Sequence, residues 1–410
     1  MDDDSVSAAA RRMERAREEF PAATRLTYMN GGSRGLMSRR VNAVLSALID
    51  EHTEAAGDKA GWQRIVAEAR ARFANLVNAE HADEVATVRN TSDGLNAVAR
   101  AMPWQPGDNL VICAELEEPT TIYAWYALRS LGVEVRHVPA RDGMFDIPRM
   151  IDAIDGRTRL LVASSVTWVP GLRTDIDSLG AACRERGIFF LVDAVQGLGV
   201  IPLDVRRSRV DGLAAATYKS LLGIHGLGYL YVRREWAEQM VPCYQSRDGV
   251  DFESAVVFEA GRGGNAEPHY AFKPAAQRFR IGHDNYAAAH AARESMGMLL
   301  DLGIPAIERH VTALTRRMAE GFLELGLPVV GGAPGPHTAH MVALGRRHPG
   351  YSDVTTHDPD LDALARRLAE SDVVFSIRNG QLRFALHLYN NDEDVTRVLD
   401  LARAHCASRH

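Results

Sequence analysis

The sequence has few cysteines and no long apolar run. Only four of its 410 residues are cysteine, and they lie far apart with no Cys-X-X-Cys pair. That distribution argues against a disulfide scaffold and against a bound metal, and it fits a reducing cytoplasm. No window reaches the roughly 18 uninterrupted apolar residues that a membrane helix needs, and the acidic, then amphipathic N-terminus has no apolar signal core. We therefore expect a cytoplasmic protein.

The sequence also lacks a concentration of positive charge. Lysine and arginine total 47 against 53 acidic residues, and the two signs are interleaved along a chain whose net charge is -6. Proteins that bind nucleic acid present a concentrated basic face, and none is visible here. A small molecule is the expected partner, with neither nucleic acid nor membrane.

What the sequence has in quantity is apolar segments that alternate with helical ones. With 46% hydrophobic residues, the chain can build one large and one smaller core. The expected strands of the middle region are runs of apolar residues at 109–116, 133–139, 159–166, 188–193, 212–217 and 228–232. Runs buried on both faces and separated by helices are typical of a mostly parallel sheet covered on two sides. The sequence therefore predicts an α/β fold.

Three regions follow from this pattern. Residues 1–30 are expected to form a helix and a lead-in segment that pack with the small domain, and 31–300 to form the large domain. Helical spacing covers 40–77 and about 285–325, and the glycine-rich stretch 262–269 is expected to be a loop. Residues 301–410 alternate short strands with helices, which predicts a small α+β domain.

Several chemically active side chains stand just after the predicted strands. In open α/β sheets, ligands bind beyond the carboxyl ends of the strands. Asp193 ends one apolar run and Lys219 follows another, both in otherwise apolar surroundings. Thr91 and Ser92 begin a helical segment, where hydroxyls and free amides form a ready phosphate site. An amine, a carboxylate and a phosphate cup are together what pyridoxal phosphate (PLP) requires.

The motifs around these residues resemble those of a known family. The segments "LVDAVQGLG", "ATYKSLLGIHGLGYLYV", "RFRIGHDNY" and "LRFALHLYNNDEDV" are similar to those of fold-type I PLP enzymes of the class V aminotransferase family. That family includes cysteine desulfurases, C-S lyases and isopenicillin N epimerase. The resemblance runs from about residue 28 to 398. It implies a seven-stranded, mostly parallel sheet between helices, a small C-terminal domain and a homodimer.

The resemblance assigns the cofactor ring to four residues. Lys219 would form the Schiff base, and Asp193 would keep the pyridine nitrogen protonated. Gln196 would form a hydrogen bond with the phenolic oxygen of the cofactor, and Val195 would pack against one face of the cofactor ring. Ser165 occupies a place often held by asparagine or histidine near the cofactor oxygen.

The resemblance implies that residues of both subunits bind the cofactor phosphate. Thr91 and Ser92 would bind it, with Tyr218 standing where many relatives have a histidine. His283, in "RIGHDN", would reach the phosphate from the neighbouring subunit, so the active sites would lie at the subunit interface.

Three residues are candidates for binding the substrate. Arg383 matches the arginine that holds the substrate carboxylate, and Asn30 and Tyr123 are candidate contacts of the substrate side chain. Glu118, or Pro119 next to it, stands where relatives cover the ring with an aromatic residue. Glu118 is therefore a candidate acid or base. Glu117 is an alternative.

Each assignment has a plainer alternative. Lys219 could be an ordinary strand-end lysine, and Asp193 a turn residue before a glycine. Thr91 and Ser92 could be simple helix caps. The two glutamates could form a solvated acidic turn, and Tyr123 could belong to the core. Arg383 could be a paired structural arginine and His283 a surface residue.

The expected reaction is C-S β-elimination from a cysteine S-conjugate, in specialised metabolism. Cysteine desulfurases need a mobile cysteine nucleophile in or before the C-terminal domain, and this chain has no cysteine between Cys243 and Cys406. The alternatives are amino-acid epimerisation, decarboxylating oxidative deamination and transamination. A PLP-fold protein that binds without catalysis is the alternative of another class.

Overall fold

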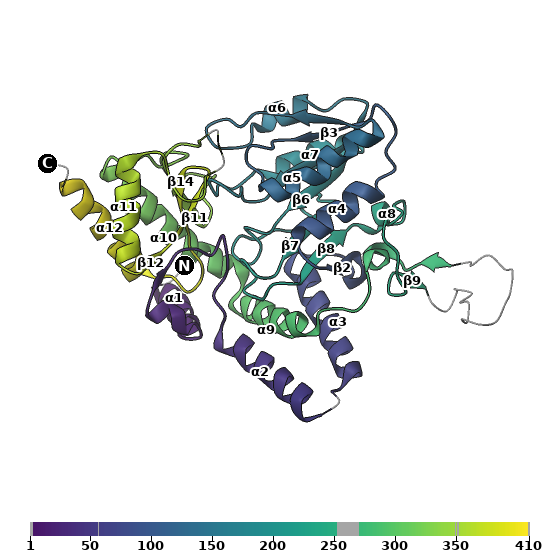
Figure 1. Ribbon diagram of the computed structural model, residues 1–410, viewed down its shortest axis with the longest axis horizontal. Helices are drawn as coiled ribbons and strands as arrows, with labels where there is room; N and C mark the ends of the chain where they lie inside the picture. The colour runs from purple at the N-terminus through teal and green to yellow at the C-terminus, as the bar shows by residue number, and fades with distance from the viewer. Residues whose placement is uncertain (1–2, 56, 252–269, 349, 351, 409–410) are drawn as a thin grey trace.

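A computed structural model describes residues 3–55, 57–251, 270–348, 350 and 352–408. The expected loop at 262–269 lies outside the described residues. The chain forms a large domain around one sheet and a smaller domain beside it, with α1 (Asp3–Glu18) against the smaller one (Figure 1). Among the described helices, none combines the length and apolar character that crossing a bilayer requires.

The large domain is built on a seven-stranded sheet in the order β2-β8-β7-β6-β5-β3-β4. Its strands are β2 (Val85–Val88), β3 (Asn109–Ile112), β4 (Glu134–His137), β5 (Thr158–Ser164), β6 (Phe189–Asp193), β7 (Gly212–Ala216) and β8 (Gly228–Val232). Only β8 runs antiparallel to its neighbours, and the remaining pairs are parallel. The predicted α/β fold with a mostly parallel seven-stranded sheet is confirmed.

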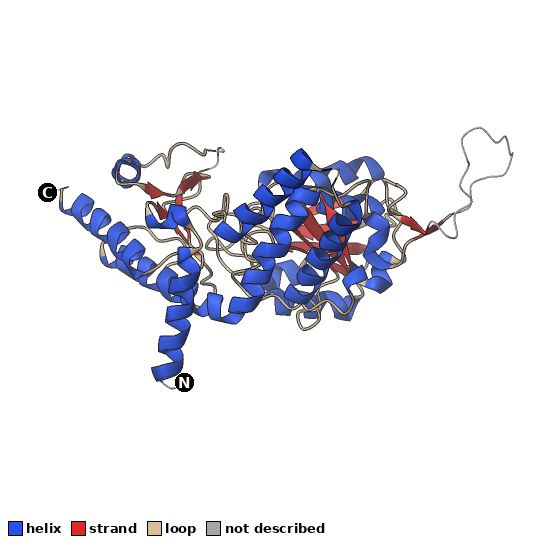
Figure 2. Cartoon of the chain, turned by 90° about the horizontal axis from the view of Figure 1, so that it is seen from below, coloured by secondary structure: helices blue, strands red, loops and turns tan. Residues whose placement is uncertain are grey.

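The central strands β6, β7 and β8 are buried over their whole length because helices cover both faces of the sheet (Figure 2). Along β6, Phe190 and Val192 enter one hydrophobic cluster, whereas Phe189 and Leu191 enter the other. Side chains alternate across a strand, so a strand that lies between two helical layers must be apolar at every position.

The helices of the large domain lie before, between and after the strands of the sheet along the chain. They are α2 (Arg39–Glu54), α3 (Lys59–Leu76), α4 (Thr91–Ala101), α5 (Pro119–Tyr126), α6 (Ile147–Asp152), α7 (Ile176–Arg186), α8 (Arg234–Ala237) and α9 (Tyr286–Leu302). The helical spacing at 40–77 thus belongs to two helices, and α9 packs against both of them. Strand β2, four residues long, was not among the expected strands.

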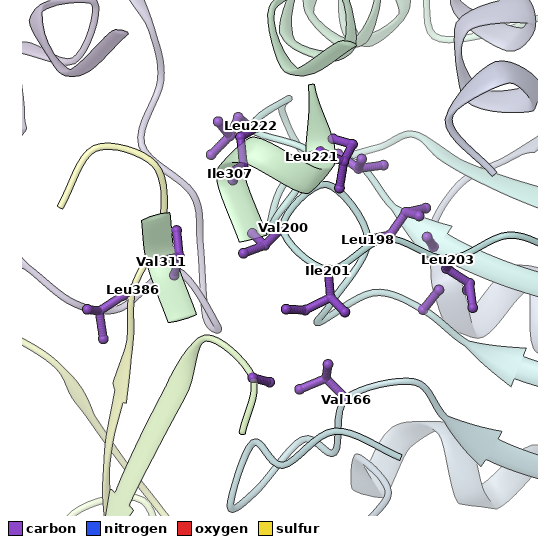
Figure 3. Packing of buried hydrophobic residues seen from close by; sticks show 14 of the residues in the cluster. Val166, Leu198, Val200, Ile201, Leu203, Leu221, Leu222, Ile307, Val311 and Leu386 are labelled. Atoms are coloured by element: carbon purple, nitrogen blue, oxygen red, sulfur yellow. The ribbon is translucent and has the colours of Figure 1, made fainter. Parts of the chain in front are cut away.

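The small domain contains a three-stranded antiparallel sheet with β14 in its centre. Its elements are α10 (Ile304–Glu324), β11 (Met341–Leu344), α11 (Pro359–Glu370), β12 (Val373–Val374), β13 (Ser376–Arg378), β14 (Gln381–Ala385) and α12 (Asp392–Ala407). Figure 3 shows Leu222 of the large domain next to Ile307 of α10, and the same hydrophobic cluster includes Val311 of α10 and Leu386 of the small domain. One core therefore continues from the large domain into the small one.

The N-terminal segment joins the two domains. Strand β1 (Thr27–Tyr28) pairs in parallel with β12, and Arg17 forms an ion pair with Asp394 at 2.8 Å. Further on, the amide of Gly35 donates to the carbonyl of Tyr218 at 2.9 Å. Residues 30–35 therefore lie between the small-domain sheet and the loop that carries Lys219.

Candidate active site

A cavity of about 1120 Å³ opens at the ends of the central strands, next to the small domain. It gathers residues that the sequence predicted from separate segments: Thr91, Ser92, Glu118, Asp193, Val195, Tyr218, Lys219, His283 and Arg383. Carboxyl ends of parallel strands share one edge of a sheet, which explains why residues more than a hundred positions apart meet here.

Lys219 is buried, and burial lowers the pKa of its amine to about 8, although the nearby Asp193 carboxylate opposes this shift. Its Nζ lies 5.7 Å from the centre of the Tyr218 ring. The backbone is held closely, because a side chain at Gly35 would place its Cβ 2.4 Å from the Lys219 carbonyl oxygen. A lysine with a lowered pKa supplies a neutral amine near physiological pH, which is the reactive form.

Asp193 ends β6 and faces the same cavity. Its Oδ1 accepts a hydrogen bond from the Val195 amide at 2.9 Å. Burial raises the pKa of the carboxyl to about 6, while the Val195 bond and the Lys219 charge work in the opposite direction. A cationic ring nitrogen in the cavity would stabilise its ionised form.

The small domain contributes two arginines. Arg383 is fully buried, and its Nη1 donates to the carbonyl of Trp168 at 2.7 Å while its Nη2 donates to Ser33 Oγ at 3.0 Å. Arg378 also donates to Ser33 Oγ, at 3.2 Å, and pairs with Asp353. Arg378 and Trp168 line the cavity but were not predicted, because spacing alone does not show which loop residues face inward.

The N-terminus of α4 forms another wall. Asn90 caps the helix by accepting from the Asp93 amide at 2.9 Å, and Thr91 Oγ1 accepts from the Ala216 amide at 3.0 Å. Ser92 Oγ lies 3.5 Å from Thr120 Oγ1. Thr91 thus has a structural role, but its hydroxyl hydrogen is still available. The helix dipole and its unpaired amides favour an anion at this wall.

The two adjacent glutamates occupy different environments. Glu118 caps α5, accepting from the Thr120 amide at 2.9 Å, and lines the cavity. Glu117 is buried away from it and accepts from the Ser164 amide at 2.9 Å. Of the alternatives that the sequence left open, Glu118 is the one that faces the cavity.

The remaining predicted residues lie at or beyond the margin. Gln196 is buried, and neither its Oε1 nor its Nε2 has a partner among the described residues. Asn30 forms an isolated β-bridge with Ala385 and lies two residues before Gly32, which lines the cavity. Ser165 lines a second cavity of about 510 Å³ instead, and Tyr123 is 67% exposed. The structure therefore does not bring Ser165 and Tyr123 to the main cavity.

The cysteines stay away from the cavity. Cys113 and Cys183 are buried in the core, Cys243 is exposed and Cys406 is half-buried in the last helix, and none lines the cavity. In the part of the chain that the structure describes, no group of three or more metal-ligating side chains is found.

The chain belongs to the class V aminotransferase family. The family model described as "Aminotransferase class-V" matches residues 42–398, which confirms the resemblance seen in the motifs. An uncharacterized aminotransferase of Bacillus subtilis, YcbU, is 28% identical over 390 residues, covering 94% of this chain and 96% of that protein. The family's enzymes depend on PLP and act on amino acids.

Solved structures share the fold over nearly the whole chain. The apo cysteine desulfurase of Thermococcus onnurineus NA1 has a TM-score of 0.81 at 22% identity, with 96% of this chain and 98% of that chain covered. The cystine C-S lyase C-DES, in complex with its reaction product cysteine persulfide, has a TM-score of 0.79 at 19% identity. The match covers 93% of this chain and 99% of the C-DES chain. At these identities the likeness shows the fold.

The residues of the cavity fit PLP. The buried side-chain amide of Gln196, at the margin of the cavity, has no partner among the described residues, and a polar atom of the cofactor would satisfy it. The amide lies beside Gly32, where a Cβ would come within 3.2 Å of both Gln196 Oε1 and Arg383 Cζ. The Lys219 amine, the Asp193 carboxylate and the N-terminus of α4 complement the aldehyde, the ring nitrogen and the phosphate.

Proposed function

We propose that this protein is a PLP-dependent enzyme that catalyses C-S β-elimination from a cysteine S-conjugate. One observation carries the proposal: Lys219, Asp193 and Arg383 come from three different segments, one of them in the small domain, and line one cavity. An amine, a carboxylate and a guanidinium arranged around a cavity suit an α-amino acid bound to PLP. A non-catalytic PLP-fold protein would have no need to keep all three.

Lys219, Asp193, Gln196, Thr91 and Ser92 would hold the cofactor, which supplies an electron sink for the bond broken at Cα. Val195 and Tyr218 would pack beside it, and His283 would approach the phosphate of a neighbouring subunit in a homodimer. The Asp193 carboxylate would keep the ring nitrogen protonated. Arg383 would bind the substrate carboxylate, a task that suits its planar, bidentate guanidinium.

Lys219 would remove the Cα proton, because its pKa of about 8 leaves a fraction of neutral amine at neutral pH. Loss of the Cβ-sulfur bond follows, and Glu118 lies on the cavity wall where it can return a proton to the leaving sulfur. With water consumed, the products are a thiol, pyruvate and ammonium. No cysteine lines the cavity to accept sulfur as a persulfide, which supports release of a free thiol.

Epimerisation is the second candidate, and Glu118 is the observation that favours it. A two-base epimerase needs a second group that exchanges a proton with Cα, on the face opposite the lysine. Glu118 lines the same cavity as Lys219, and its negative charge is close enough to raise the pKa of the lysine amine. Transamination and decarboxylating oxidative deamination would use the same lysine, but no described residue favours them specifically.

The test uses the purified PLP-loaded protein and a panel of S-alkyl and S-glycosyl cysteines, in deuterated water and under air. The elimination reaction yields pyruvate and a free thiol, measured by mass spectrometry. Deuterium at Cα without pyruvate would instead support epimerisation, and carbon dioxide release with oxygen uptake would support oxidative deamination.

Lys219→Ala is the control variant, both for the covalent binding of the cofactor and for catalysis. It should abolish turnover and the visible absorbance band of lysine-bound cofactor. A wild-type protein that shows no such band with PLP, or a Lys219→Ala protein whose band is still reduced by borohydride, would refute the proposal.

A further inference from the structure

His225 and Tyr218 form a stacked pair on the wall of the main cavity. Their ring centres are 4.0 Å apart and their planes differ by 19°. Both residues line the cavity, together with Asn90 and Ser92 at the start of α4. No hydrogen bond joins the His225 ring nitrogens to another described residue, so these nitrogens are available to a ligand.

The loop that carries His225 is held in place by its own hydrogen bonds. Thr217 Oγ1 donates to the carbonyl of Ile224 at 2.8 Å and lies 3.1 Å from that of Leu227. The side-chain amide of Asn285 donates to the carbonyl of Gly226 at 3.4 Å. His225 therefore projects from fixed backbone, which lowers the entropy lost when its ring binds a ligand.

The same loop lies against the N-terminus of α4. It leads directly into β8, whose first residue, Gly228, pairs with Val88 of β2. A Cβ at Gly228 would lie 3.2 Å from the Cα of Asn90, the residue that caps α4. The imidazole, the capping segment and the amides of the helix therefore border one part of the cavity.

From this geometry we propose that His225 binds the cofactor phosphate and does so from a ring stacked on Tyr218. This inference rests on the proposed PLP function. His225 lines the same cavity as Asn90 and Ser92 at the start of α4, and Tyr218 orients its imidazole by stacking. An imidazole N-H is a good partner for a phosphate oxygen, and charge-assisted bonds are the stronger ones.

The test compares PLP with pyridoxal, which lacks the phosphate, as ligands of the apo-protein. His225→Phe keeps an aromatic ring to stack on Tyr218 but has no N-H donor. We expect its affinity for PLP to fall about tenfold to a hundredfold, with its affinity for pyridoxal unchanged. Absorbance titration gives both affinities. The phosphorus NMR shift of bound PLP should change as well.

His137→Phe is the matched control. His137 also contacts a tyrosine ring, that of Tyr126, at 5.6 Å between centres, but it does not line the cavity. Its affinities for both ligands should match the wild type. If His225→Phe does not fold, His225→Asn and His225→Leu form a smaller pair, of which only the asparagine variant keeps a donor.

The outcomes separate the two proposals. If the wild type binds PLP and pyridoxal normally and His225→Phe binds both as the wild type does, the role of His225 is refuted while the PLP function stands. An equal loss for both ligands would likewise contradict a phosphate-specific role. A wild type that binds neither ligand would refute both proposals.

Discussion

Glu117 gives the sharpest test of the electrostatics behind the active site. It is 3% exposed, and Ser164, the neighbour of Asp193 in the sheet, donates its amide to Oε1 and its hydroxyl to Oε2. Burial raises the pKa of Glu117 from 4.5 to about 8, the Asp193 charge adds to the shift, and the Ser164 bonds oppose it. In the folded protein the carboxyl therefore keeps its proton well above the pH at which the unfolded chain loses it.

The sign of the pH dependence follows from the proton count. Between pH 4.5 and about 8 the folded chain holds one proton more at Glu117 than the unfolded chain. Stability therefore falls as pH rises, by about 1.4 kcal/mol per pH unit and about 5 kcal/mol over the window. Glu117→Gln has the same shape, can still accept from the Ser164 amide, and does not titrate.

The assay is urea unfolding of the apo-protein, wild type and Glu117→Gln, at several pH values between 5 and 9. The difference in unfolding free energy, wild type minus variant, should fall by about 1.4 kcal/mol per unit up to pH 8 and then become level. Infrared spectroscopy should show a protonated carboxyl band that the variant lacks. Ser164→Ala should move the upper end of the window to higher pH, because a bond that lowers the pKa of Glu117 is lost. A difference that does not change with pH would refute the reasoning.

Two further predictions concern the walls of the cavity. Gly35→Ala would force its Cβ against the Lys219 carbonyl, and calorimetry should show a loss of about 1–3 kcal/mol, whereas Gly156→Ala, with open space around it, should change stability by less than about 0.5 kcal/mol. A Gly35→Ala protein as stable as Gly156→Ala would contradict the close packing. Arg383→Lys cannot reproduce the planar guanidinium, so steady-state kinetics should show KM for the amino acid raised about tenfold or more with kcat changed less. An unchanged KM would show that Arg383 does not bind the substrate.

The sequence predicted the sheet and the strand-end residues because both depend on local patterns. Asp193 and Lys219 follow apolar runs, and the topology of parallel strands brings such positions together. Two features were harder to predict for physical reasons. The apolar run at β2 is only four residues, Val85–Val88, between Glu84 and Arg89, and so is shorter than the runs at 109–116 and 133–139 that revealed β3 and β4. The helical pattern at 40–77 did not reveal the break between α2 and α3.

Loop residues were predicted less well, because which side a loop residue faces is decided by tertiary packing. Glu117 and Glu118 are neighbours in the chain, yet one is bound to Ser164 and the other faces the cavity. Ser165 was expected near the cofactor and lines a different cavity, while Trp168, three residues later, lines the main one. Arg378 and His225 carried no spacing signal of their own.

The segment at 27–35 has a consequence for how the chain is made. Ser33 meets Arg378, which lies 345 residues further along the chain, and β1 finds its partner strand in the same late region. During synthesis, the N-terminal segment therefore cannot form these contacts until almost the entire chain has emerged from the ribosome. Contacts of such long sequence separation form late and slowly. A ribosome-bound chain that ends before β12 would have the large-domain sheet but an incomplete cavity.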